Sequence, residues 1–137
     1  MRFTLPNLEP GAVIEYRYEL GVENWQLIPS WSFQHGEPTL YSEYRMHIPG
    51  ALEYVTLTTG TQKYDTVDSK GHRGTGELEK WWIMTEVPAL REEPFMTTLE
   101  DYRSRLRFQL KAFRNPATGA VEKRFMSSWP DVAESML

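Results

Sequence analysis

Apolar and polar residues alternate with a period of two along several short stretches of this chain. Successive side chains of a β-strand point to opposite faces, so this alternation predicts strands that are buried on one side. It occurs in residues 12–20, 40–48 and 102–113. We therefore predict a half-buried strand at each of the three. In the first of them, the apolar face consists of Ala12, Ile14, Tyr16, Tyr18 and Leu20.

Residues 77–87, "ELEKWWIMTEV", carry apolar side chains on both parities. A strand of this kind is usually covered on both sides, either centrally within a fold or by a neighbouring domain. Adjacent tryptophans in a strand must point to opposite faces. Trp82 shares its parity with Leu78 and Met84, so we expect it in the core beside Leu106 and Phe108, with Trp81 on the outer face.

Glycine and proline interrupt these segments about every ten residues, without any alternation of strands and helices. Residues 59–77 are polar and glycine-rich, which suggests a hairpin with a long mobile tip, although Tyr64 and Val67 could continue a strand. Near the end, Ser128 can cap a helix that has Pro130 in its first turn. The fold class predicted is all-β, an antiparallel β-sandwich with a short C-terminal helix.

The length of 137 residues suits one domain. We expect the sandwich to occupy residues 1–126, and residues 127–137 to form a helical linker toward a downstream domain. The net charge of −4 provides no general field that would attract nucleic acid, and no apolar run approaches the roughly 20 residues needed to span a bilayer. The chain has no cysteine, which excludes thiol chemistry within it.

Glu92 and Glu93 stand next to each other between two prolines, in "EVPALREEPFM" at residues 86–96. A catalytic acid and base must flank one bond, whereas neighbours in an extended segment project to opposite sides. We therefore interpret this stretch as a shaped connector, because the residue before each proline is held extended. One glutamate is expected to accept hydrogen bonds at the loop, and the other to be solvated.

Other signals of chemistry are weak. His35, His47 and His72 are scattered, without the spacing of metal ligands. Asp65 and Asp68 precede Gly71, but the remaining calcium-loop ligands are absent. The glycine-rich residues 71–76 are expected to be a flexible turn, because no helix follows that could bind a phosphate. We predict no catalytic residue, no cofactor and no metal.

Basic residues share one parity in the strand predicted at residues 102–113, and the aromatic residues Tyr102 and Phe108 lie on the other parity. Binding of nucleic acid would require aromatic side chains on the basic face. We expect instead a solvated face whose charges pair across strands with glutamates. The basic residues are Arg103, Arg105, Arg107 and Lys111, and the glutamates suggested are Glu15, Glu19 and Glu79.

Five tryptophans occur in this short chain, at Trp25, Trp31, Trp81, Trp82 and Trp129. Aromatic faces stack on sugar rings, which keeps open an alternative in which exposed tryptophans bind a glycan. Large aromatic residues in a small sandwich more often belong to a core or an interface.

Several phrases of the sequence together resemble a known family. They are "LPNLEPGAVIEYRYEL", "WSFQ", "SEYRMHIP", "VPALREEPFMTTLEDYRSRLRFQL" and "SSWPDVA". In this order they are similar to the transglutaminase-associated domain of unknown function that precedes a transglutaminase-like domain in exported bacterial proteins. The resemblance implies an accessory β-sandwich without known catalytic residues, periplasmic or at the cell surface. Family members have further N-terminal strands, so the chain is expected to be a fragment.

We therefore predict a non-enzymatic accessory module that packs against or positions a transglutaminase-like or peptidase-like domain of its parent protein. The alternative is a ligand-binding sandwich for glycan or peptide, and an independent hydrolase is a third possibility. No nucleic acid or membrane insertion is expected. The candidate interface residues are Trp31, Gln34, Trp81, Glu92, Glu93, Phe95 and Trp129.

Overall fold

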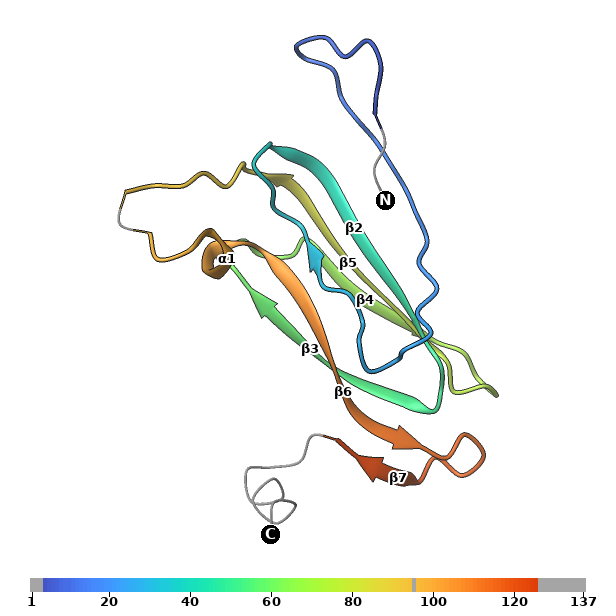
Figure 1. The fold of residues 1–137 in the computed structure, drawn as a ribbon. Coiled ribbons are helices and arrows are strands. Elements are labelled where there is room, and N and C mark those ends of the chain that lie inside the picture. Colours follow the sequence, from blue (N-terminus) through green and yellow to red (C-terminus); the bar gives the residue numbers. More distant parts are fainter. Residues whose placement is uncertain (1–3, 95, 126–137) are drawn as a thin grey trace.

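The computed structural model describes residues 4–94 and 96–125, and their regular structure is almost entirely β-strand (Figure 1). The one helix in this part of the chain is a single turn, α1 (Leu99–Tyr102). The helix predicted from Ser128 onward lies outside the described residues. The strands are β1 (Trp31–Ser32), β2 (Thr39–Ile48), β3 (Leu52–Thr59), β4 (Thr66–Gly71), β5 (Leu78–Val87), β6 (Arg105–Arg114) and β7 (Val121–Arg124).

The strands form two antiparallel sheets, which confirms the predicted all-β class. In one sheet, β6 lies between β3 and the short strands β1 and β7, which pair with opposite ends of β6. In the other sheet, β5 is central, between β2 and β4. The sheets face each other in a sandwich-like arrangement (Figure 1). The neighbours of β2 in sequence, β1 and β3, both lie in the other sheet, so the chain crosses between the sheets before and after β2.

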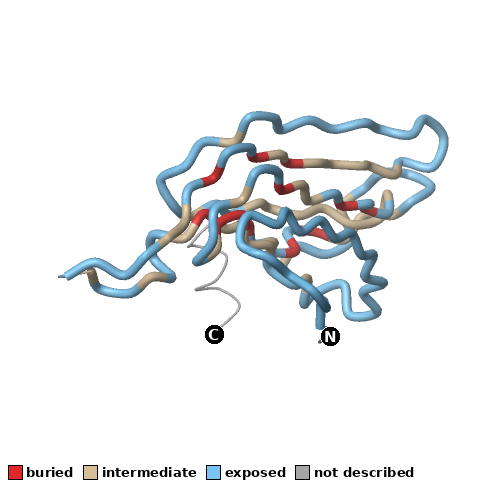
Figure 2. Tube along the Cα trace, turned by 90° about the horizontal axis from the view of Figure 1, so that it is seen from above, coloured by how far each residue is buried: buried red, intermediate tan, exposed pale blue. Residues whose placement is uncertain are grey.

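The core lies between the facing sheets, and exposed residues dominate the outer segments (Figure 2). Trp82 is 4% exposed, and its ring centre lies 5.6 Å from that of Phe108. Its predicted core position beside Leu106 and Phe108 is therefore confirmed. Tyr44 of β2 stacks on Phe108 across the sandwich at 5.2 Å. The buried core cluster comprises Phe33, Met46, Ile48, Trp82, Met84, Val87 and Leu106.

Three of the predicted strands are present as β2, β5 and β6. In β2, Met46 and Ile48 are buried as expected, whereas Leu40 at the start of the strand is 63% exposed. Ser42 occupies the buried face instead. Its hydroxyl oxygen accepts a hydrogen bond from the indole N–H of Trp31 at 3.2 Å, which satisfies both polar groups beneath the sheet.

The prediction of a half-buried strand at residues 12–20 is wrong. These residues are extended and exposed, and they pair with no described strand. On the predicted apolar face, Ile14 is 50% and Leu20 64% exposed. Alternation specifies which side chains would share a face, but a strand also needs a neighbour for its backbone hydrogen bonds. The described residues do not supply that neighbour.

Residues 59–77 are not one long hairpin tip. They contain β4, and Gly71, which the sequence placed in a turn, is the last residue of that strand. Residues 60–65 carry the chain from one sheet to the other, where the ring of Tyr64 contacts that of Phe33 at 5.3 Å. The true turn joins β4 to β5 and contains Gly74 at a positive φ of 96°. The suggestion that Val67 continues a strand is confirmed.

A register shift changes the face of the last residues of β6, from Ala112 onward. Glu53 lies opposite Ala112, but the next residue, Tyr54, lies opposite Leu110. Lys111 is therefore the extra residue of a β-bulge. As a result, Ala112 points to the side of Glu53 and not to the side of Leu110, which corrects the face predicted from strict alternation.

Candidate functional site

The expected interface tryptophans lie in different places. Trp31 is half-buried in β1, where its ring lies 5.7 Å from Tyr44. Trp81 is half-buried on the outer face of the β5 sheet, with the guanidinium of Arg45 5.8 Å from its ring centre. Trp25 is 38% exposed and packs against other aromatic rings. Phe95 and Trp129 lie outside the described residues.

Gln34 is an internal residue and not a surface contact. It is 4% exposed at one end of the sandwich. Its side-chain amide donates to the carbonyl oxygen of Pro88 at 3.0 Å, and its carbonyl oxygen accepts from the backbone N–H of Ser104 at 3.4 Å. Buried amides of this kind join segments that are distant in sequence. Gln34 is therefore not accessible to a partner that docks on the surface.

The connector at residues 86–96 leaves the sandwich close to Pro88, whose carbonyl oxygen is bonded to Gln34. Its backbone is fixed to the domain once more, where Leu90 N–H donates to the carbonyl oxygen of His35 at 2.8 Å. Beyond Leu90, the chain projects away from both sheets before it returns to α1 (Figure 1). Glu92 and Glu93 are both exposed on this projection. The arrangement places two solvated carboxylates on a rim and not in a pocket.

The N-terminal segment presents the largest run of exposed apolar side chains. We call residues 12–22 the N-terminal apolar segment. It runs along the outside of β2 (Figure 1), and the ring of Tyr18 touches Trp31 at 6.0 Å. Contiguous exposed apolar surface in a small domain commonly marks a contact with another molecule. Its large apolar members are Val13, Ile14, Tyr16, Tyr18, Leu20 and Val22.

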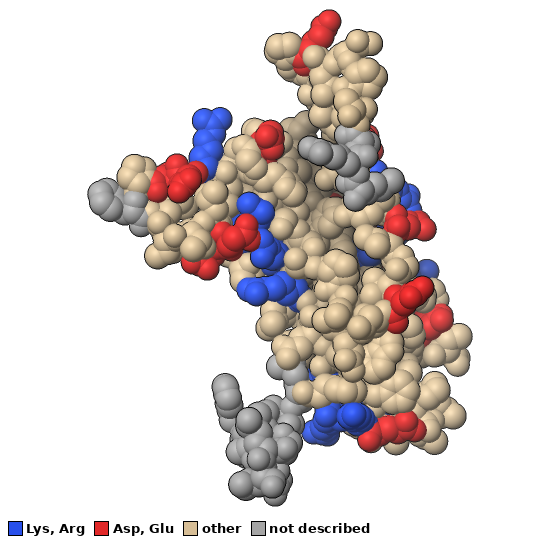
Figure 3. Space-filling model, viewed as in Figure 1, with Lys and Arg blue, Asp and Glu red and all other residues tan. Residues whose placement is uncertain are grey.

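Ion pairs form at Arg105 and Lys111 of β6 and at Arg103 just before it, as the sequence suggested. Figure 3 shows Lys and Arg gathered over this strand, with acidic side chains beside them. Glu100 of α1 pairs with Arg103 at 3.3 Å and also with Arg105. The prediction that Glu19 and Glu79 would be the partners is wrong, because both pair with arginines of other segments. Glu79 pairs with Arg45 and Glu19 with Arg17.

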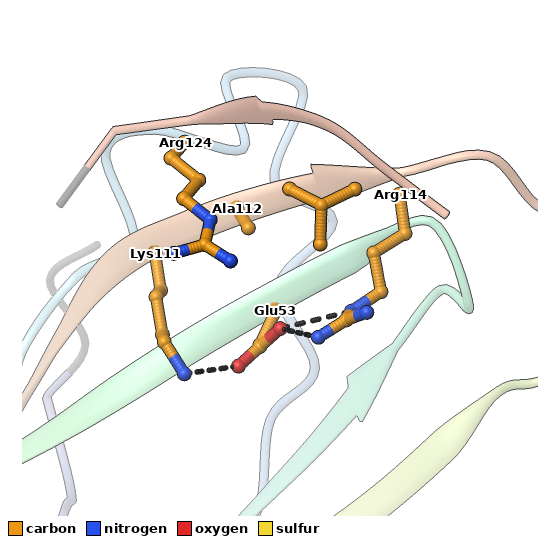
Figure 4. A pocket seen from close by; sticks show the side chains of 6 residues that line it. Glu53, Lys111, Ala112, Arg114 and Arg124 are labelled. Atoms are coloured by element: carbon orange, nitrogen blue, oxygen red, sulfur yellow. Dashed lines mark hydrogen bonds and ion pairs between the residues drawn. The ribbon is translucent and has the colours of Figure 1, made fainter. Parts of the chain in front are cut away.

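A second group of charges surrounds Glu53 on the β3–β6–β7 surface, where the bulge at Lys111 occurs (Figure 4). The Lys111 ammonium lies 2.5 Å from one carboxylate oxygen of Glu53. Arg114 donates to the other oxygen from Nη2 at 2.5 Å and from Nε at 2.9 Å. Hydrogen bonds from Lys111 and then from Arg114 hold the pKa of the Glu53 carboxyl below its usual value.

Sequence reasoning missed Glu53, Arg114 and Arg124 as members of one cluster. The three residues come from three strands, and only the pairing of β3, β6 and β7 brings them together. Strict alternation also places Lys111 and Arg114 on opposite faces of β6, and the bulge removes that separation. No signal in the sequence marks the bulge.

An open groove lies between the free edges of β3 and β4. It has a volume of about 480 Å³, and its walls include Thr56, Tyr64, Val67 and Trp82. β4 pairs with β5, and β3 with β6, so each has one edge that is unpaired among the described strands. A wide opening of this kind can admit an extended segment, but nothing in the described residues specifies one.

The remaining polar clusters are small. His47 lies beside His72, with 6.3 Å between ring centres, and its Nε2 is 3.7 Å from a carboxylate oxygen of Glu77. Within residues 4–94 and 96–125, no three His, Asp or Glu side chains gather as ligands for a metal ion. No helix in this part of the chain is long and apolar enough to cross a membrane.

One family of proteins is similar to this chain over most of its length. The family model DUF3857, described as a domain of unknown function with a solved structure, matches residues 1–90. No curated protein matches the chain. No solved structure matches it either.

Proposed function

Because the chain belongs to the DUF3857 family of domains of unknown function, we propose that it is a non-enzymatic accessory module that packs against or positions another domain of its parent protein. The partner proposed is a transglutaminase-like or peptidase-like domain. This partner is suggested by the phrases that resemble the transglutaminase-associated domain. The same resemblance suggests a periplasmic or cell-surface location.

The observation that carries the proposal is the N-terminal apolar segment. Its residues alternate as in a strand with one buried face, yet Ile14, Tyr18 and Leu20 of that face are half or more exposed. Burying apolar surface contributes about 25 cal/mol per Å², so covering this face would stabilise an assembly with a partner. A partner can also supply the backbone hydrogen bonds that complete a strand.

The arrangement of the glutamates favours an accessory role over catalysis. Catalytic carboxylates are usually held in a cleft where burial or a neighbour shifts their pKa values. Glu92 and Glu93 instead stand exposed on the projecting connector. The tightly held carboxylate, Glu53, is ion-paired with Lys111 and Arg114, which leaves it a poor base.

The proposal is tested by measuring binding of the purified chain to a transglutaminase-like domain of the same parent protein. Leu20→Ser should weaken binding because it removes apolar contact area. Leu40→Ser is a matched control, since Leu20 is 64% and Leu40 63% exposed and Leu40 belongs to β2, outside the segment. Absence of binding by the unmodified chain, or equal loss in both variants, would overturn the proposed docking surface.

Turnover assays test the non-enzymatic part of the proposal. The purified chain should show no peptidase, transglutaminase or glycosidase activity, with or without added metal ions. Activity that co-purifies with the chain and disappears in Glu92→Gln or Glu93→Gln would contradict the accessory role.

A further inference from the structure

We propose that Lys111, Arg114 and Arg124 form a binding site for a single oxyanion, the carboxylate or phosphate group of a ligand. This site is on the outer surface of the β3–β6–β7 sheet, and it does not depend on the docking role proposed above. Figure 4 shows the three cationic side chains around Glu53 and Ala112.

The strand register creates the site. Ala112 lies opposite Glu53 of β3 on one side and opposite Arg124 of β7 on the other, so these three residues stand in a row across the sheet. Lys111 already lies on the face of Arg105 and Arg107, and the bulge at Lys111 brings Ala112 and Arg114 to that same surface. Because Ala112 has the smallest side chain of the row, the long side chains on either side of it enclose a space.

The charges around this space do not balance. Glu53 is the one carboxylate that lines it, and Lys111, Arg114 and Arg124 supply three cations. Glu53 is ionised and already holds Lys111 and Arg114 at 2.5 Å. Arg124 has no carboxylate partner among the described residues. The neighbouring Glu122 is bonded to the side-chain amide of Asn115 at 2.7 Å.

The donors and the space suit a small oxyanion. A guanidinium presents a planar fork of N–H donors that matches a carboxylate or phosphate, and Lys111 has two further ammonium protons besides the one given to Glu53. The cavity has a volume of about 90 Å³, with Ala112 and Val121 as its apolar lining. That volume holds a few water molecules or one small anionic group.

The proposal is tested by titrating the whole chain with inorganic phosphate, and separately with acetate, at constant ionic strength. Binding is followed by the NMR shifts of the Arg124 guanidinium and the Lys111 backbone amide. We expect saturable shifts at these groups, and a loss of affinity of about tenfold or more in Arg124→Gln, because a charge-assisted hydrogen bond is removed. Arg107→Gln is the matched control, since Arg107 is exposed on the same strand but away from the cavity.

Each outcome bears on the proposal. Saturation by acetate and phosphate supports a general oxyanion site, and saturation by only one of them assigns the site to a carboxylate or to a phosphate group. Shifts that do not saturate, or an equal loss in Arg124→Gln and Arg107→Gln, would show only general charge screening and overturn it. Lys111→Gln provides a second variant if Arg124→Gln does not fold.

Discussion

At the residue scale, the clearest contrast is between two adjacent side chains of the same type. Trp82 is 4% exposed inside the sandwich, and its ring lies against Tyr44 and Phe108. Trp81 is only half-buried on the outer face, next to the guanidinium of Arg45. The two differ because successive side chains of β5 point to opposite faces of one sheet.

Substitution of each tryptophan by alanine should therefore have unequal effects. Trp82→Ala should lower the free energy of unfolding by about 3–5 kcal/mol, because it leaves a cavity in the core. That loss is enough to unfold a domain of marginal stability. Trp81→Ala should cost appreciably less, and should mainly weaken contact with a partner. Denaturant unfolding of both variants measures the difference, and equal large losses would mean that both rings are internal.

At the element scale, the sandwich depends on a few places where backbones approach closely. Gly60 follows β3 at a φ of 92°, at the start of the segment that crosses to the other sheet. A Cβ at this position would lie 2.6 Å from the backbone Cα and N of Ser104, just before β6. The backbone atoms of Ser104 cannot move aside as the end of a flexible side chain could.

Gly60→Ala should destabilise the domain more than Gly74→Ala. Both glycines have a similar positive φ, so both substitutions incur about 1–2 kcal/mol of backbone strain. A Cβ at Gly74 meets nothing within 4 Å, whereas Gly60→Ala should lose about 1–3 kcal/mol more through overpacking. Thermal or denaturant unfolding of the two variants checks this. Equal losses would show that the loop at Gly60 shifts freely.

At the scale of the whole molecule, the two sheets form a shared core, and the N-terminal apolar segment lies outside it. The buried residues come from β2, β5, β6 and the segment around β1. Residues 12–20 instead run alongside β2 without pairing with it (Figure 1). The domain therefore has a stable centre and one long apolar stretch that a partner can cover.

Amide hydrogen exchange should separate these two parts. The amides of residues 12–20 should exchange fast in the isolated chain, because the segment belongs to no sheet. The amides of β5 should exchange slowly, because it is hydrogen-bonded to strands on both sides. Exchange is measured by mass spectrometry or NMR. Protection of residues 12–20 as strong as that of β5 would show that the segment already pairs within the isolated chain.

The sequence by itself determined the fold class, the strands β2, β5 and β6, and the side of the sheet on which Trp82 lies. These follow from local alternation, since a period of two assigns each side chain to a face. It also indicated the solvated basic face of β6. Alternation no longer predicts the face of a side chain where a strand shifts register, and it does not predict whether a strand has a partner.

Only the tertiary structure decided the rest. Residues 12–20 have the pattern of a strand but no neighbour to complete it, and Ala112 changes face because of a bulge that no local pattern marks. The Glu53 cluster and the buried Gln34 both depend on contacts between segments far apart in the chain. Such contacts arise from strand pairing and packing, which are properties of the whole chain and not of any short stretch of it.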